Sequence, residues 1–174
     1  MAVDATRTLR GAVAGALAAG VWAVQQPLDK RAFGVDYDDA DLLGRFVASG
    51  RWVLPAGTVL HLSNGALFGA VYANVAPRVP LPAWARGPLA GLIEHVATWP
   101  ATAVLGRRQP SGAQPLPQLF GNRRAFAQAT WRHLLFGAVL GELERRLNSD
   151  FDVLPSAAYS SNGHGSVEHL AAVH

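Results

Sequence analysis

Polar side chains capable of acid–base or ligand chemistry recur inside otherwise apolar stretches of this sequence. The ionisable candidates are His61, Glu94, His95, Arg132 and His133. Further polar groups in the same stretches are Asn64, Trp99 and Gln128. Histidine changes its charge near neutral pH and is a common metal ligand, whereas arginine keeps its charge. The set predicts a polar cluster with a structural, proton-moving or metal-binding role.

Three chemistries are compatible with this cluster. In the first, Glu94 and Arg132 form an ion pair, and the histidines and glutamines hydrogen-bond between helices and fix their packing. In the second, Glu94 and the histidines titrate around the fixed charge of Arg132 and conduct protons, ions or small solutes. In the third, haem or a metal ion is bound by His61, His95 and His133. No two of these histidines stand at i and i+4, so the first role is favoured and no cofactor is expected.

Other chemistries are poorly supported. There is no cysteine, which excludes disulfides, thiolate metal sites and cysteine nucleophiles. Ser63 lacks a Gly-x-Ser-x-Gly elbow, and no glycine-rich phosphate-binding loop is present. The net charge of +3 is too small and too dispersed to favour nucleic acid as a partner. The sequence therefore predicts a protein that is not an enzyme.

The elements that would position these groups are four apolar stretches, each near the ~20 residues that span a bilayer: 8–28, 56–77, 85–106 and 125–147. Half of the 174 residues are hydrophobic and only 16% are charged. A water-soluble four-helix bundle should show a charged face on each helix, but residues 11–28 carry no ionisable side chain. These patterns favour an all-α, four-helix transmembrane bundle in the bacterial inner membrane over the soluble bundle.

Glycine pairs and a repeated pentapeptide predict how the four helices pack. Each stretch carries one Gly-xxx-Gly pair, a spacing that lets helix backbones approach closely: Gly11/Gly15, Gly65/Gly69, Gly87/Gly91 and Gly137/Gly141. Residues 67–71 and 135–139 have the same sequence, Leu-Phe-Gly-Ala-Val. The chain therefore reads as two duplicated helical hairpins, although abundant glycine and alanine make such matches common.

The connecting segments add smaller features. Residues 39–49 fit a short amphipathic interfacial helix with Asp38 or Asp39 as its N-cap. Two arginine pairs bracket a proline-rich segment and either bind lipid phosphates or are ordinary juxtamembrane residues: Arg107/Arg108 and Arg123/Arg124. Residues 1–148 form the predicted domain and 149–174 a disordered tail. Lysine and arginine are too evenly distributed between the loops to orient the bundle.

Three segments carry a family resemblance: His61–Gly65, Glu94–Pro100 and Gly121–His133. They resemble a group of uncharacterised small bacterial four-helix integral membrane proteins, over residues 7–148. More loosely, the glycine-rich helices with internal histidines are similar to the YagU-like inner-membrane family of unknown function. The resemblance implies a helical integral membrane protein and brings no catalytic residue or substrate.

The function predicted from these patterns is that of a multi-pass membrane protein acting as a non-enzymatic scaffold, an accessory subunit or a small homo-oligomer. Its partners would be the lipid bilayer and either itself or another membrane protein. A transporter-like bundle that uses the Glu/His/Arg cluster is the alternative, and a haem- or metal-binding membrane protein ranks third. The substrate, the partner and the oligomeric state are not specified by the sequence.

Overall fold

The computed structural model describes residues 4–105 and 116–151, and these residues are helical throughout apart from short connections. The four long helices are α1 (Ala5–Phe33), α3 (Val53–Val75), α4 (Ala83–Thr98) and α6 (Arg123–Leu147). Two short helices accompany them, α2 (Asp39–Gly44) and α5 (Ala101–Leu105). Single 3₁₀ turns are η1 (Gly50–Trp52), η2 (Ala76–Arg78) and η3 (Ser149–Phe151).

Local signals set the ends of these helices. The Asp4 carboxylate caps α1 by accepting a hydrogen bond from the Arg7 amide, and Asn122 caps α6 in the same way. Gly34 ends α1 in the left-handed conformation, with φ of 69°, which few other residues adopt without strain. Pro100 has no N–H to continue the hydrogen-bond ladder of α4, so this helix ends just before it.

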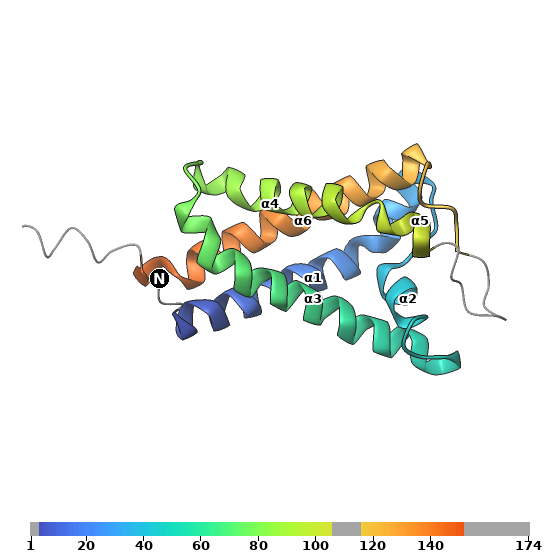
Figure 1. Cartoon of the computed structure of the whole chain (residues 1–174), viewed down its shortest axis with the longest axis horizontal. Coiled ribbons are helices and arrows are strands. Elements are labelled where there is room, and N and C mark those ends of the chain that lie inside the picture. Colours follow the sequence, from blue (N-terminus) through green and yellow to red (C-terminus); the bar gives the residue numbers. More distant parts are fainter. Residues whose placement is uncertain (1–3, 106–115, 152–174) are drawn as a thin grey trace, which may run out of the picture.

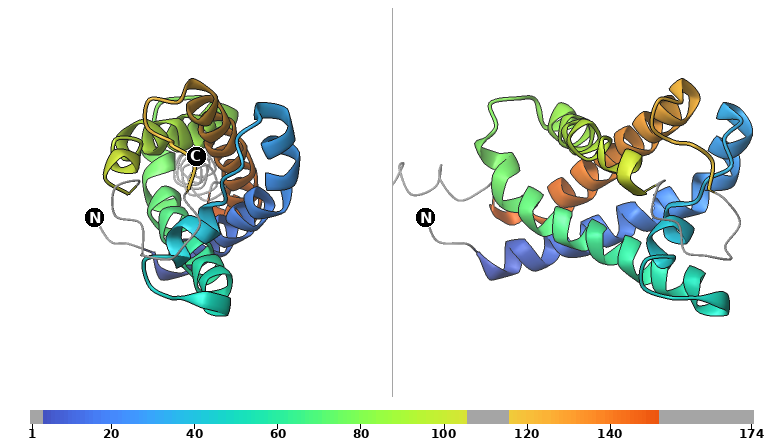
Figure 2. Two further views of the ribbon diagram at one scale, coloured as in Figure 1. Left: turned by 90° about the vertical axis from the view of Figure 1, so that its right-hand side faces the viewer. Right: turned by 45° about the vertical axis from the view of Figure 1, so that its right-hand side comes forward.

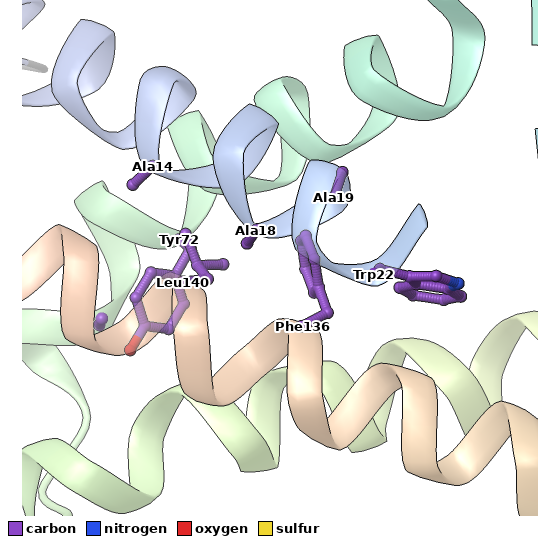
Figure 3. Packing of buried hydrophobic residues seen from close by; sticks show 8 residues of the cluster. Ala14, Ala18, Ala19, Trp22, Tyr72, Phe136 and Leu140 are labelled. Atoms are coloured by element: carbon purple, nitrogen blue, oxygen red, sulfur yellow. The ribbon is translucent and has the colours of Figure 1, made fainter. Parts of the chain in front are cut away.

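The long helices form two pairs that pack on each other. Helix α1 packs against α3 and α6, and α4 packs against α6, as Figure 1 shows. In the main hydrophobic core (Figure 3), side chains of α1 meet Tyr72 of α3 and Phe136 and Leu140 of α6. The α1 residues are Ala14, Ala18, Ala19 and Trp22. Helices α3 and α4 are joined through η2 and diverge from this connection (Figure 2).

Glycine backbones form the closest helix contacts. A Cβ added to Gly15 would overlap the carbonyl oxygen of Gly65, and one on Gly69 would overlap that of Gly11. In the second pair, a Cβ on Gly87 would overlap the Gly137 carbonyl, and Gly141 lies beside Gly87. Gly91 faces the carbonyl of His133 in the same pair. The Gly-xxx-Gly pairs thus lie within the molecule, between α1 and α3 and between α4 and α6.

The predicted transmembrane architecture is wrong. In residues 4–105 and 116–151, no helix combines the length and the apolar character needed to cross a bilayer. The predicted span 85–106 is divided at Pro100, and α4 has 16 residues, about 24 Å at ~1.5 Å per residue against a hydrocarbon core of ~30 Å. Helix α3 is interrupted by polar side chains, among them His61 and Asn64.

The first and last long helices, α1 and α6, carry more charged side chains than α3 and α4. Helix α1 continues past the predicted boundary at residue 28 and includes Asp29, Lys30 and Arg31. Helix α6 is charged at both ends and in the middle: Arg123, Arg124, Arg132, Glu142, Glu144, Arg145 and Arg146. The predictions of a multi-pass inner-membrane location, a scaffold within the bilayer and a transmembrane transporter all required spanning helices, so they are corrected together.

The segments outside the four long helices are partly described. A short helix does occupy the first connection, but α2 has six residues rather than the eleven of 39–49, and Asp38 is its N-cap. Residues 149–151 of the predicted tail form η3, where Asp150 pairs with Arg10 at 2.6 Å. The rest of the predicted tail, 152–174, and the arginines at 107 and 108 lie outside the described residues.

Candidate functional site

A cavity of about 550 Å³ lies where α3 and α4 diverge. Helices α1 and α6 contribute to its wall through Trp22 and Phe136, while α2 closes one end with Leu42 and Leu43. This volume is within the range of small-molecule sites, which are concave and mostly apolar with a few polar groups. Six of the predicted site residues line it: His61, Asn64, Glu94, His95, Trp99 and His133.

The polar side chains of the lining gather at one end of the cavity. Along α3, His61 and Asn64 lie toward α2, whereas Leu67, Phe68 and Val71 follow toward the connection with α4. Helix α4 runs the other way and places Glu94 at its C-terminal end, next to the polar end of α3. The cavity therefore has a polar end near α2 and an apolar end near the α3–α4 connection.

The polar end contains a Glu–His contact between α4 and α6. Nε2 of His133 lies 3.3 Å from Oε2 of Glu94. The other ring nitrogen, Nδ1, donates to the carbonyl oxygen of Ala129 at 2.7 Å, so it must carry a hydrogen. The contact with Glu94 is attractive only when a proton lies between Nε2 and the carboxylate. Glu94 and His133 are thus placed to hold a proton at the cavity wall.

His95 is a second buried imidazole at this end, and it is electrically neutral at neutral pH. The Thr130 hydroxyl donates to the carbonyl of Phe126, so Nε2 of His95 donates to Thr130 Oγ1 at 3.0 Å. Its ring packs 4.8 Å from the His133 ring. Burial, and then the charge of His133, lower the pKa of His95 from 6.5 to about 4. His95 therefore adds no positive charge to the cavity.

His61 is held by α1 rather than by the other histidines. Its Nε2 donates to the Ala19 carbonyl at 3.1 Å, and its ring packs edge-on against Trp22 at 5.2 Å. Within the described residues, no group of three or more histidine, aspartate or glutamate side chains is arranged to hold a metal ion. His61, His95 and His133 therefore do not form such a group, and the haem alternative stays a prediction.

A buried ion cluster lies behind the cavity. Arg132 is fully buried and binds Asp29 through two hydrogen bonds, from Nε at 2.7 Å and from Nη2 at 2.6 Å. Its Nη1 donates to Asp39 Oδ2 at 2.6 Å, and the same oxygen accepts from Trp22 Nε1 at 3.0 Å. Arg132 therefore pairs with Asp29 and Asp39, and the predicted ion pair with Glu94 is not formed.

Tyr37 and Gln128 also belong to the buried ion cluster. The Arg132 guanidinium lies 4.3 Å from the centre of the Tyr37 ring, and burial raises the pKa of that phenol above its usual range. Desolvation alone lowers the pKa of Arg132, but its hydrogen bond to Asp29 and the charge of Asp39 outweigh it, and the net shift is upward. Gln128 donates to Asp29 at 2.6 Å, while its buried Oε1 has no partner within the described residues.

Sequence reasoning missed the two aspartates of this cluster. Asp29 lies just beyond the apolar stretch that ends at residue 28, and the sequence indicates only a helix-capping role for Asp39. A usable signal is the excess of acidic residues just after the first stretch, together with Arg132 in the interior of the last stretch. Arg132 and Gln128 lie with these aspartates in the buried cluster and do not line the cavity.

Comparisons with protein-family models, with curated proteins and with solved structures give no match to this chain. The resemblance to small bacterial membrane proteins therefore stays a prediction.

Proposed function

We propose that this protein binds a small, largely apolar molecule with one polar end in the cavity between α3 and α4. The observation that carries the proposal is the cavity itself, about 550 Å³ in volume and lined mainly by aliphatic and aromatic side chains. Its lining favours an apolar occupant.

The segregation of the lining supports the second half of the proposal. An apolar body fits between Leu67, Phe68 and Val71 of α3 and Phe136 of α6. A polar end would then lie near Glu94, in reach of the side chains that gather close to α2. Polar groups at one end of an apolar site fix the orientation of a ligand more than they add to its affinity.

The rigid surroundings also favour binding. The helices that line the cavity are held together by glycine contacts, which bring the backbones of α1 and α3 and those of α4 and α6 into direct contact. The buried ion pairs of Arg132 add to these contacts. Such contacts hold the lining in place before a ligand arrives. A preformed site loses less conformational entropy on binding, which improves affinity.

Binding of a neutral apolar dye tests the proposal. N-phenyl-1-naphthylamine becomes fluorescent in apolar surroundings, and we expect saturable one-to-one binding to the full-length protein. Val71 is an exposed side chain at the rim of the apolar end of the cavity, so Val71→Trp should cover that end and weaken binding by about tenfold or more, on the order of 1.4 kcal/mol. Fluorescence titration measures both quantities.

Val59→Trp is the matched control. Val59 is exposed on the same helix and is outside the cavity lining, so a tryptophan there adds the same apolar surface without filling the cavity. We expect it to bind the dye as the unaltered protein does. Equal binding by both tryptophan variants and the unaltered protein would show that the dye sits elsewhere on the surface, and the proposed site would be wrong.

A further inference from the structure

The charged side chains that line the cavity are of one sign when the histidines are neutral. Its described lining includes the carboxylates of Asp39 and Glu94 and no lysine or arginine. Arg132, whose guanidinium pairs with Asp39, is fully buried. Three imidazoles also face this space, from His61, His95 and His133. A ligand in the cavity therefore meets carboxylates at one end and no exposed guanidinium or ammonium group.

The buried ion cluster of Arg132, Asp29 and Asp39 has one more negative charge than positive charges. Arg132 supplies one positive charge, while Asp29 and Asp39 supply two negative ones. Asp29 takes two of the guanidinium hydrogen bonds and is almost completely buried, whereas the Asp39 side chain is 20% exposed. The excess negative charge thus lies on the side of the cluster that faces the cavity.

The imidazoles do not reverse this balance. Nε2 of His61 is occupied by the Ala19 carbonyl, and His95 donates to Thr130 as a neutral ring. A proton on His133 is matched by Glu94, its partner at 3.3 Å. While His61 is neutral, the polar end of the cavity consequently carries a net negative charge whether or not His133 is protonated.

Aromatic side chains supply the second requirement for binding a cation. Trp22, Tyr37 and Trp99 line the same end of the cavity as the two carboxylates, and Phe68 and Phe136 continue the wall. Aromatic faces attract cations through their quadrupole, most strongly where water is excluded. The cluster already shows this interaction internally, since the Arg132 guanidinium lies over Tyr37.

We infer that this cavity selects an organic cation, an amine or quaternary ammonium group carried on an apolar body. The inference rests on the proposed binding function and specifies its ligand class. The cationic group would lie between the carboxylates of Glu94 and Asp39 and the tryptophan rings, with the apolar body toward Val71. The lining has carboxylates to pair with a cation and aromatic rings to cover its methyl groups.

Three probes of nearly the same shape test the charge preference: benzyltrimethylammonium, its uncharged carbon isostere neopentylbenzene, and the anion phenylmethanesulfonate. Each is titrated into the full-length protein below its solubility limit, and binding is followed by calorimetry and by tryptophan fluorescence. We expect the cation to bind about tenfold more tightly than the isostere and the anion more weakly than both.

Two variants locate the effect. Glu94→Gln removes a carboxylate whose side chain is 35% exposed, so it should fold normally, and we expect it to weaken cation binding several-fold while leaving isostere binding unchanged. Glu142→Gln removes the same charge from an exposed position on α6 outside the cavity, and it should bind all three probes as the unaltered protein does.

The outcomes separate this inference from the proposed function. Isostere or anion binding as tight as that of the cation, with Val71→Trp still weakening it, would overturn the ligand class and leave the cavity as a binding site. An equal effect of Glu94→Gln and Glu142→Gln would also overturn it, because the preference would then come from overall charge. No binding of any probe, together with no effect of Val71→Trp on the dye, would overturn the proposed function as well.

Discussion

His95 shows how the surroundings of a single side chain set its charge. It is 1% exposed, it donates to Thr130, and its pKa is lowered from 6.5 to about 4 by burial and by the charge of His133. The unfolded chain therefore binds a proton at pH 5 that the folded protein does not. By linkage, the free energy of unfolding decreases as the pH falls through the window from about 6.5 to about 4.

This linkage predicts a specific pH dependence. Between pH 7 and pH 4 the His95 site should cost roughly 1–3 kcal/mol of stability, measured by urea unfolding at several pH values. His95→Gln keeps a donor for Thr130 but does not titrate, so its stability should fall less steeply over the same range. Parallel pH profiles for the two proteins would mean that the pKa of His95 is the same in the folded and unfolded states, which would contradict this prediction.

At the residue level, the sequence indicates which polar side chains could lie together but not which partner each of them has. His61, Asn64, Glu94, His95, Trp99 and His133 were grouped by their helical positions, and all of them line one cavity. The partner of Arg132 could not be chosen the same way, because Asp29 is distant in sequence and lies beyond the apolar stretch. Spacing along a helix shows which side chains share a face, but it does not show which face of another helix they meet.

At the scale of the elements, the glycine crossings determine how closely the helices approach. Gly15 and Gly65 place the backbones of α1 and α3 in contact, and Gly87 and Gly137 do the same for α4 and α6. These glycines are inside helices, where each costs up to about 1 kcal/mol relative to alanine. Close packing of the backbones offsets that cost.

Gly15→Ala should therefore destabilise the protein, because its Cβ would overlap the Gly65 carbonyl and force α1 and α3 apart. We expect a loss of about 1–3 kcal/mol in the free energy of unfolding, measured with urea. Gly20→Ala is the control on the same helix: its Cβ meets no atom within 4 Å, so higher helix propensity should leave stability unchanged or raise it by up to about 1 kcal/mol. Equal effects of the two substitutions would contradict a steric role for Gly15.

Element boundaries were less predictable than element existence. The four long helices lie close to the predicted stretches, but α1 extends to Phe33 and the third stretch is divided at Pro100. Runs of apolar residues show where helices are packed in the interior. The last turn of α1 is charged, so an apolar run does not reveal that the helix continues there. The membrane prediction failed for a related reason: small apolar residues that pack helices together also raise hydropathy.

At the scale of the whole molecule, a large apolar surface remains exposed. Helix α1 alone presents a continuous row of exposed side chains: Leu9, Val13, Leu17, Val21, Val24 and Leu28. Exposed apolar areas of this kind often mark surfaces that bind another molecule. Self-association and a second protein as partner, both expected from the sequence, stay predictions.

The Arg132 cluster connects three elements that the glycine crossings do not join. Arg132 belongs to α6, Asp29 to α1 and Asp39 to α2. Arg132→Gln would leave two carboxylates buried or half-buried without their counter-charge, so we expect a loss of about 3–5 kcal/mol in the free energy of unfolding. Adding Asp29→Asn should recover part of this loss, since one of the unpaired charges is then removed.

Arg145→Gln provides the comparison for this variant. Arg145 lies on the same helix and pairs with Glu142 at the surface, where water already solvates both groups. Urea unfolding should detect little change in this variant. A similarly small change for Arg132→Gln would contradict a stabilising role for the ion pairs that Arg132 forms with Asp29 and Asp39.

The distance along the chain between the members of this cluster also has a consequence for synthesis. Arg132 follows Asp29 by 103 residues and Asp39 by 93. On a translating ribosome, α1, α2 and α3 emerge and can pair through their glycines well before the guanidinium that neutralises the aspartates exists. Contacts of such long sequence separation form late and slow folding. The first helices must therefore keep these carboxylates hydrated until α6 arrives, and final docking of the two halves is the expected last event of folding.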